Sequence, residues 1–449
     1  MKSVVLILFT FQSIILFSQD LYPPCEWSNS GVVHEDEKEA KTIDFKSRKA
    51  ELGGNVTDDQ VLESILSFQS EAVIFFPAGD YHFKKQIRLK SNCSFGGAGK
   101  ESRLHFDLEK DVDPILVQGK ITTDTFSIGH GLSRGEGHID FKFSNSKISR
   151  YSYYLLIDDD EAFVKSWWAR GKTGQIIEVI EVKEGRVRLR DSLRRDYGSE
   201  VKLVKLQPVQ QIVISNISII NESKTSNQTS NICFRYAAKC QVIDVFSYKA
   251  NYAHICLEFS TNCGIFGSSF SGAQDYGNGG KGYGVAFQFA TSSSSLEQSK
   301  FDSLRHSILL QAGANGNYIA HNESTNPYWT DVKLPATSAG DIVLHGNFPY
   351  ANLIEMNKCK TIVIDKSHGM NGPYNTFFNN EVSGYGIWQL KGSSCGPQYW
   401  INNKVIGEKG RYKLNGDFYE QYNQFRDNIY PSDSKENPAR TMRFGGLID

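Results

Sequence analysis

The sequence lacks the features that mark several large classes of protein. Its formal net charge is −1 over 449 residues, so bulk electrostatics gives no support to nucleic-acid binding. No CxxC pair and no Cys/His cluster with metal-ligand spacing occurs, which argues against a structural zinc site. No unit of the chain carries the helix-periodic stretch that helical repeats need, and the leucine-rich consensus is missing. These absences leave a β-structured protein as the expectation.

The N-terminus predicts export. Lys2 is followed by an apolar run from Val4 to Phe17 and then by Ser18-Gln19-Asp20, the order of a secretory signal peptide. The run is short for a membrane span and no second one follows. We therefore expect residues 1–19 to be removed, and the mature protein to be soluble and periplasmic or secreted.

Eight cysteines in an exported chain permit disulfides. Cys233 and Cys256 are 23 residues apart, as are Cys240 and Cys263. Each pair could form a bridge, or could fill a solenoid core with small apolar side chains.

A repeat organises the chain between Gln211 and Asn403. The segments QIVISN, QVIDVF, GIFGSS, SSLEQS, NYIAHN, NLIEMN, NTFFNN and QYWINN follow one another at steps of 30, 23, 30, 23, 35, 23 and 23 residues. A basic unit of 23 residues with occasional insertions predicts a solenoid, in which each unit forms one coil.

Two columns of this alignment predict side-chain positions. The third residue is always apolar and is expected to point into one shared core: Val213, Ile243, Phe266, Leu296, Ile319, Ile354, Phe377 and Trp400. The sixth is Asn in five of eight segments: Asn216, Phe246, Ser269, Ser299, Asn322, Asn357, Asn380 and Asn403. A recurring amide at one turn predicts a ladder in which each Asn bonds the next.

A second strand lies upstream in each coil, because apolar residues alternate there at period two. The pairs and triplets are Ile232/Phe234, Ile255/Leu257/Phe259, Val285/Phe287/Phe289, Ile308/Leu310, Ile342/Leu344 and Ile362/Ile364. Short parallel strands without helices predict an all-β protein, a parallel β-helix.

Breaks in the coil pattern predict the domain organisation. Tyr151 to Leu206 interrupts the rhythm, and its alternating segment from Gly174 turns at Glu184-Gly185, which predicts a hairpin-based insertion. A short amphipathic helix near Asp58 to Ser70 is expected to cap the open end of the solenoid. The predicted regions are a cap at 20–70, first coils at 71–150, the β insertion at 151–206, main coils at 207–410 and a C-terminal cap or tail at 411–449.

The segment AVIFFPAGDYHFKKQIRLKSNCSFGGAG, Ala72 to Gly99, resembles the opening coil of the pectate-lyase-like superfamily of right-handed parallel β-helices. The run from Asn231 to Ile387 resembles a group of secreted bacterial β-helix proteins, often of the Bacteroidetes type. The superfamily resemblance implies that catalytic groups lie on one sheet. They would be two carboxylates for hydrolysis, or a base and a cation for β-elimination of a uronate. Insertions like 151–206 also occur in its carbohydrate-active members.

A polar column is predicted on the outer face of the upstream strands, one residue after each inward side chain: Arg235, Glu258, Gln288, Gln311, His345 and Asp365, with Gln389 next. Such a column offers hydrogen bonds to an extended glycan. Glu258 and Asp365 would be four coils apart, roughly 19 Å, too far to act as a pair on one bond. His345 and Asp365 would be neighbours, so the sequence predicts a catalytic cluster of His345, Asp365 and the nearby His368.

Arg235, Arg305 or Lys366 could meet an acidic sugar. Arg235 and Glu258 could instead form a surface ion pair, and Arg305 could anchor a loop through backbone carbonyls. The aromatic residues Tyr328 and Trp329 belong to a long insertion loop and are further candidates for substrate binding.

The Trp167-Trp168 pair could stack on sugars or pack onto the β-helix. Asp341 is either a turn former or a calcium ligand, and the run Asp158 to Glu161 either attracts Ca²⁺ or is simply solvated. No resident metal is otherwise predicted.

The leading hypothesis is thus a secreted lyase that cleaves an acidic polysaccharide by β-elimination. A non-catalytic glycan-binding or surface-structural β-helix is the second hypothesis, and a glycoside hydrolase is the third. The sequence leaves the oligomeric state open.

Overall fold

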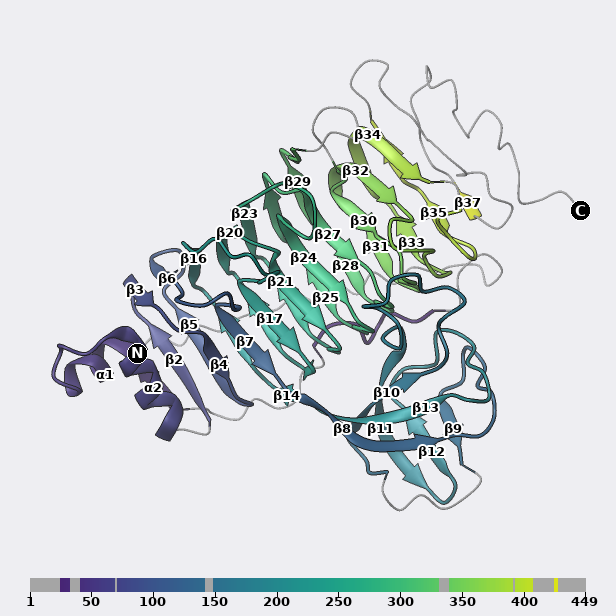
Figure 1. Cartoon of the computed structure of the whole chain (residues 1–449), viewed down its shortest axis with the longest axis horizontal. Helices are drawn as coiled ribbons and strands as arrows, with labels where there is room; N and C mark the ends of the chain where they lie inside the picture. The colour runs from purple at the N-terminus through teal and green to yellow at the C-terminus, as the bar shows by residue number, and fades with distance from the viewer. Residues whose placement is uncertain are drawn as a thin grey trace, which may run out of the picture.

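The computed structural model describes residues 25–32, 41–68, 71–141, 148–330, 339–390, 392–406 and 424–426. Within these residues the chain winds into coils stacked along one axis, with the helices α1 (Phe45–Glu51) and α2 (Asp58–Phe68) at one end and the strand β37 (Gln424–Arg426) at the other (Figure 1). Coil strands pair in parallel with the strands above and below them. The predicted parallel β-helix solenoid is confirmed; the predicted signal peptide, residues 1–19, lies outside the described residues.

The coils build three faces, which we name A, B and C. Face A contains β1 (Lys41–Asp44), β2 (Ala72–Phe76), β5 (Cys93–Gly97), β15 (Val213–Ser215), β19 (Gln241–Ile243), β22 (Gly264–Phe266), β25 (Ser295–Glu297), β28 (Tyr318–Ala320), β31 (Leu353–Glu355), β33 (Thr376–Phe378), β35 (Tyr399–Ile401) and β37. Face B contains β3 (Gly79–Phe83), β6 (Ser102–Phe106), β16 (Ser218–Asn221), β20 (Phe246–Ala250), β23 (Ser269–Ala273), β26 (Lys300–Asp302), β29 (Glu323–Thr325) and β36 (Lys404–Val405).

Face C contains β4 (Ile87–Leu89), β7 (Ile115–Gln118), β17 (Ile232–Arg235), β21 (Ala253–Glu258), β24 (Tyr283–Gln288), β27 (His306–Leu310) and β30 (Ile342–Leu344). The strands β32 (Lys358–Ile364) and β34 (Glu381–Gln389) run through faces B and C, and β14 (Val209–Gln210) pairs with β18 (Ala237–Ala238) at a corner. The sequence pattern revealed the strands of faces A and C only. Face B was missed because most of its strands are rich in polar residues, although they are no shorter than those of face A.

One continuous file of apolar side chains fills the inside of face A. Leu296, Ile319, Ile354, Phe377 and Trp400 pair in register and are all fully buried, as predicted. The rings of Phe377 and Trp400 stack with centroids 4.1 Å apart. Residues one coil apart along this stretch are therefore spatial neighbours.

In the three earlier coils, the residue predicted to point inward was wrong by one position. Leu296 pairs with Ile265 and not with Phe266, and the file continues through Val242 to Ile214. The predicted inward residues Val213, Ile243 and Phe266 point outward, and Phe266 is 38% exposed. Loops of different length between coils hid the register, and because strand side chains alternate, a shift of one residue exchanges inside for outside.

The Asn ladder is confirmed from Asn322 onward. The side-chain oxygens of Asn357, Asn380 and Asn403 each accept from the backbone and side-chain amides of the preceding ladder residue at 2.9–3.1 Å. The register shift excludes Asn216, whose side chain is exposed. A second ladder, which the sequence reading missed, runs at the preceding corner through Asn317, Asn352, Asn375 and Gln398. The ladders satisfy corner backbone groups that would otherwise be buried without partners.

The insertion is larger than predicted. It is a six-stranded antiparallel sheet in the order β8 (Lys120–Ser127), β13 (Lys202–Gln207), β10 (Ser152–Ile157), β11 (Gln175–Lys183), β12 (Arg186–Leu189) and β9 (His138–Asp140). It therefore begins at Lys120, inside the region assigned to the first coils, and has its own core. The predicted hairpin turn between β11 and β12 is present. Figure 1 shows this sheet beside the solenoid axis.

The predicted capping helix corresponds to α2, and Phe45 of α1 covers the first coil, with its ring 4.8 Å from that of Phe76. At the other end β37 pairs with β35 as a further strand of face A, within the predicted tail 411–449, whose other residues lie outside the described residues. No helix in the described ranges is long and apolar enough to cross a membrane. Cys233 and Cys256 lie in register, and no disulfide joins any of the eight cysteines, all of which lie among the described residues.

Candidate active site

The predicted polar column lies on the outer side of face C. Strand pairing places Arg235, Glu258 and Gln288 one above another, and the inward residues Leu310, Leu344 and Ile364 carry the register on to Gln311, His345 and Asp365. Gln389 pairs with Ile364, so it belongs to the inward file and is no member of the column. The column extends instead to Gln118, which pairs with Arg235.

The first half of the column is a closed hydrogen-bond network. Arg235 Nε donates to Glu258 at 2.5 Å, and Gln288 Nε2 donates to the same carboxylate at 2.8 Å. The side-chain oxygen of Gln288 accepts from Gln311 Nε2 at 2.6 Å and from the Tyr252 hydroxyl at 2.8 Å. Arg235 is therefore held in the ion pair with Glu258, which was the predicted alternative to sugar binding.

The second half contains an oriented imidazole. His345 Nδ1 lies 2.5 Å from Asp365 Oδ2, and the other oxygen of Asp365 accepts from the Ser367 amide at 3.0 Å. Burial pushes the pKa of Asp365 upward, but the charge and hydrogen bond of His345 outweigh it and hold that pKa below its ordinary value. An ionised carboxylate requires a proton on Nδ1, so Nε2 of neutral His345 has a free lone pair.

Two further imidazoles adjoin His345. The rings of His368 and His306 lie 4.8 and 5.8 Å from its ring centroid. Burial lowers the pKa of His368, and burial with the nearby charges of Arg305 and His345 lowers that of His306 to about 3. His306 Nδ1 bonds the Gly340 carbonyl at 2.9 Å, and its buried Nε2 has no hydrogen-bond partner in the described part of the chain. The predicted cluster of His345, Asp365 and His368 is thus brought together, with His306 beside it.

The insertion also reaches this cluster, which the sequence could not show. Ser166 Oγ lies 3.3 Å from His368 Nδ1, and the ring of Trp168 packs edge-on against His368 at 5.3 Å. Of the paired tryptophans, Trp168 therefore packs, whereas Trp167 is 85% exposed. No sequence signal links residues some 200 positions apart across two domains.

Arg305 anchors a loop. Its guanidinium donates to the carbonyls of Gly277 (2.9 Å) and Gly279, and lies over the Trp329 ring at 4.8 Å. Trp329 is buried, and Tyr328 is on the surface at 43% exposed. Lys366, next to Asp365, is exposed. Arg235 and Arg305, two of the three cations predicted to meet an acidic sugar, are thus held by protein partners. Lys366 is the third.

The predicted calcium candidates have structural partners. Asp341 is fully buried and accepts from Ser324 and from the amides of Lys360 and Thr361. Asp160 accepts from Gly171 and Thr173. Within the described ranges no three His, Cys, Asp or Glu side chains form a group that could hold a metal ion.

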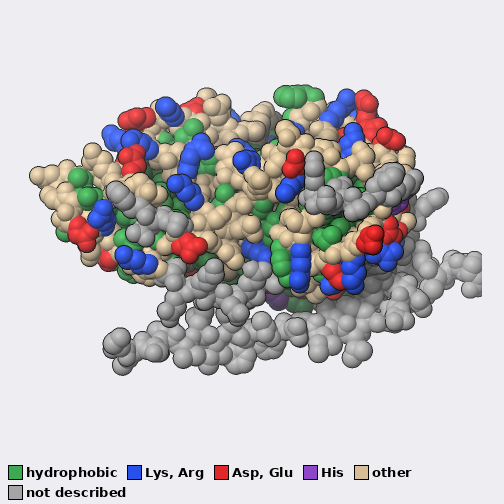
Figure 2. Space-filling view, turned by 90° about the horizontal axis from the view of Figure 1, so that it is seen from below, with side chains coloured by type: hydrophobic (Ala, Val, Ile, Leu, Met, Phe, Trp, Pro, Cys, Tyr) green, Lys and Arg blue, Asp and Glu red, His purple; other side chains and the backbone are tan. Residues whose placement is uncertain are grey.

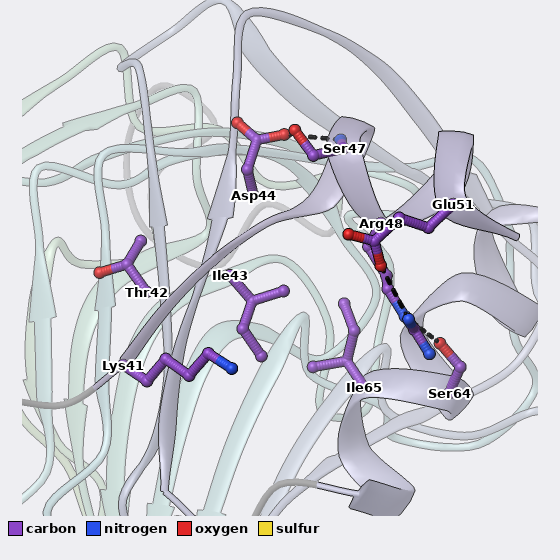
Figure 3. A pocket seen from close by; sticks show the side chains of 9 residues that line it. All are labelled: Lys41, Thr42, Ile43, Asp44, Ser47, Arg48, Glu51, Ser64 and Ile65. Carbon is purple, nitrogen blue, oxygen red and sulfur yellow. Dashed lines mark hydrogen bonds and ion pairs between the residues drawn. The ribbon is translucent and has the colours of Figure 1, made fainter.

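A pocket of about 490 Å³ lies in the N-terminal cap, between β1 and the two helices (Figure 3). Its lining includes Asp44, which caps α1 through the Ser47 amide, and Arg48, which bonds Ser64. None of the predicted site residues lines this pocket, so it contributes nothing to the column.

Face A carries a pair of carboxylates that the sequence analysis did not single out. Glu297 and Glu355 point outward two coils apart, separated by Ala320. Burial raises the pKa of both carboxyl groups, and the charge of Glu355 adds to the rise at Glu297. The Tyr318 hydroxyl donates to Glu355 at 2.6 Å. The alternation rule that identified the polar column would have found both, because each follows an inward residue of the file.

Charge is distributed without a dominant sign on the face shown in Figure 2, where Lys and Arg alternate with Asp and Glu. This pattern accords with the near-zero net charge and offers no broad basic surface on that face.

The fold is similar to that of bacteriophage tailspike proteins. Tailspike gp49 of Pseudomonas phage LKA1 matches with a TM-score of 0.58 and 16% identity, over 84% of this chain and 63% of that one. The Gp54 tailspike of Acinetobacter baumannii bacteriophage AP22, solved in complex with A. baumannii capsular saccharide, matches with 0.59 and 12% identity, over 81% and 58%. Tailspike gp61 of Pseudomonas phage phi297 matches with 0.59 and 13% identity, over 88% and 74%.

The chain thus spans about three fifths of the length of the first two tailspikes. At these identities the likeness shows the β-helix fold alone. No protein-family model matches the sequence, and no curated protein matches it.

Proposed function

We propose that this protein is a secreted polysaccharide lyase of the pectate-lyase-like type, which cleaves an acidic polysaccharide by β-elimination with His345 as the base. The main support is the 2.5 Å contact between His345 Nδ1 and Asp365, which leaves Nε2 free to accept a proton. The polar column lies on the outer side of face C, where its members from Glu258 to Asp365 are 5–9% exposed, and one tailspike of similar fold was solved with a capsular saccharide.

His345 Nε2 removes the C5 proton of a uronate, the C4–O glycosidic bond breaks, and a C4=C5 double bond forms. The departing oxygen takes a proton from an acid or from water. Asp365 orients the imidazole and stabilises the imidazolium that forms.

Lys366 is the cation that we assign to the substrate carboxylate. Withdrawing charge from this carboxylate makes the C5 proton more acidic. Lys366 is exposed and adjacent to Asp365, whereas Arg235 and Arg305 are engaged with Glu258 and with loop carbonyls.

The test is digestion of a panel of acidic and neutral polysaccharides, followed by absorbance of the unsaturated product and by reducing-end assay. Elimination predicts both signals on an acidic polymer, and His345→Ala should abolish both. His138→Ala is the matched control, because His138 lies 3.8 Å from Asp140 in an exposed pair on the insertion. Full turnover by folded His345→Ala would refute the assignment of the base.

Hydrolysis is the second candidate, and the Glu297/Glu355 pair favours it. Two coils at ~4.8 Å each separate the two backbones by about 9.6 Å, near the range of ~6.5–9.5 Å between the carboxyl groups of inverting glycosidases. Reducing ends without an unsaturated product, lost in Glu355→Gln but kept in His345→Ala, would select this site. Binding without cleavage would select the non-catalytic hypothesis.

A further inference from the structure

The loop of residues 160–173, which we name the tryptophan loop, belongs to the insertion, where it lies between β10 and β11. Asp160 closes its base by accepting from the Gly171 amide at 2.9 Å and the Thr173 hydroxyl at 2.8 Å. The loop therefore has a fixed base, to which both of its ends are tied.

The loop is also docked tightly on the solenoid. Val164 forms a bridge with Gly369, and the amides of Lys165 and Ser166 both donate to Asn347 Oδ1 at 3.2 Å. A Cβ at Gly369 would lie only 2.9 Å from the Lys165 side chain, so this glycine permits the close approach. Asn347 and Gly369 follow His345 and His368 by two and one residues, which fixes the loop against the candidate active site.

Two neighbouring tryptophans in this loop have opposite surroundings. Trp168 packs against His368 at 5.3 Å and against Phe289 at 5.9 Å. Trp167, between Ser166 and Trp168, both of which contact His368, is 85% exposed. Trp167 thus presents a large apolar ring to solvent from a rigid backbone, and its burial accounts for little of the stability of the fold.

We propose that Trp167 is a stacking platform for one sugar ring of the polysaccharide that binds across His345 and Asp365; this inference rests on the proposed function. An indole offers a flat apolar face of large area at a low cost in conformational entropy, which suits the C–H face of a pyranose. The exposed Lys165 beside it suits an acidic chain. The insertion would then supply a binding subsite, while face C supplies the reacting groups.

The test compares variants for retardation in gels that contain each polysaccharide of the panel, in the His345→Ala background so that the polymer is not cleaved. Trp167→Ala should weaken binding roughly five- to tenfold, and Trp167→Phe should restore part of it. Tyr151→Ala is the matched control, because Tyr151 is a 57% exposed aromatic residue directly before β10 of the same insertion.

The outcomes separate the two proposals. Unchanged binding in Trp167→Ala, on a polymer that the parent protein binds, overturns the platform and leaves the proposed function standing. An equal loss in Tyr151→Ala also overturns the platform, because the effect would then be general. If no polysaccharide is bound or cleaved by the unmodified protein, both proposals are overturned together.

Discussion

Replacing Asn380 by alanine tests the central structural feature of the coil stack. The Asn380 side chain is fully buried and takes part in four hydrogen bonds of the ladder. Its oxygen accepts from the amide and the Nδ2 of Asn357 at 3.1 and 3.0 Å, and its Nδ2 donates to the Ile354 carbonyl and to Asn403 at 2.9 Å.

The magnitude follows from the groups that the substitution leaves without partners. The Asn357 amide and the Ile354 carbonyl lose this partner and stay buried when the side chain is removed, whereas Asn357 Nδ2 keeps its bond to the Ile319 carbonyl at 3.0 Å. Leaving one such group unsatisfied costs roughly 1–3 kcal/mol, and partial relaxation makes the lower half of that range appropriate, so for two groups we expect a loss of about 2–4 kcal/mol in the free energy of unfolding.

Urea denaturation followed by circular dichroism measures this loss, and hydrogen exchange of the Asn357 amide reports it locally. Asn216→Gly is the control, because Asn216 is exposed and has a positive φ of 54° that glycine adopts freely. We expect it to change stability by less than about 0.5 kcal/mol. Equal effects of the two substitutions, or a loss below about 1 kcal/mol for Asn380→Ala, would refute the ladder as the source of coil stability.

Three further predictions concern single buried contacts. Burial raises the pKa of Asp341 to about 6 from an ordinary 3.8. Folding therefore favours the protonated form of Asp341. The stability that this gives below pH 4 should be lost as the pH rises through 6, a fall of up to about 3 kcal/mol in the free energy of unfolding. Asp341→Asn, which can keep its hydrogen bonds, should remove that decline in urea titrations at pH 4 and pH 7, whereas an unchanged slope would contradict it. Gly346→Ala should lower both stability and turnover, because its φ of 79° disfavours a side chain and a Cβ there would lie 2.6 Å from the Gly369 carbonyl, next to His368. Full activity would speak against a positioned His368. Arg305→Lys should expose Trp329, seen as a red-shifted tryptophan emission, because lysine cannot hold two carbonyls and stack on the indole; an unshifted spectrum would show that the loop is held otherwise.

The sequence by itself determined the coil. A 23-residue period with apolar residues at one position and amides at another has few physical solutions, because a coil cannot bury its corner backbone without partners. The same alternation placed His345 beside Asp365, since residues one unit apart become neighbours on adjacent strands.

Tertiary structure decided the register of the early coils and the composition of the site. Loops of unequal length between Val213 and Phe266 carry no mark of which residue turns inward, and only packing resolves it. Ser166 and Trp168 reach His368 because a separate sheet docks on face C, a contact that no local pattern encodes. Period and polarity are local properties of the chain, whereas docking depends on the shapes of two folded surfaces that exist only after both have formed.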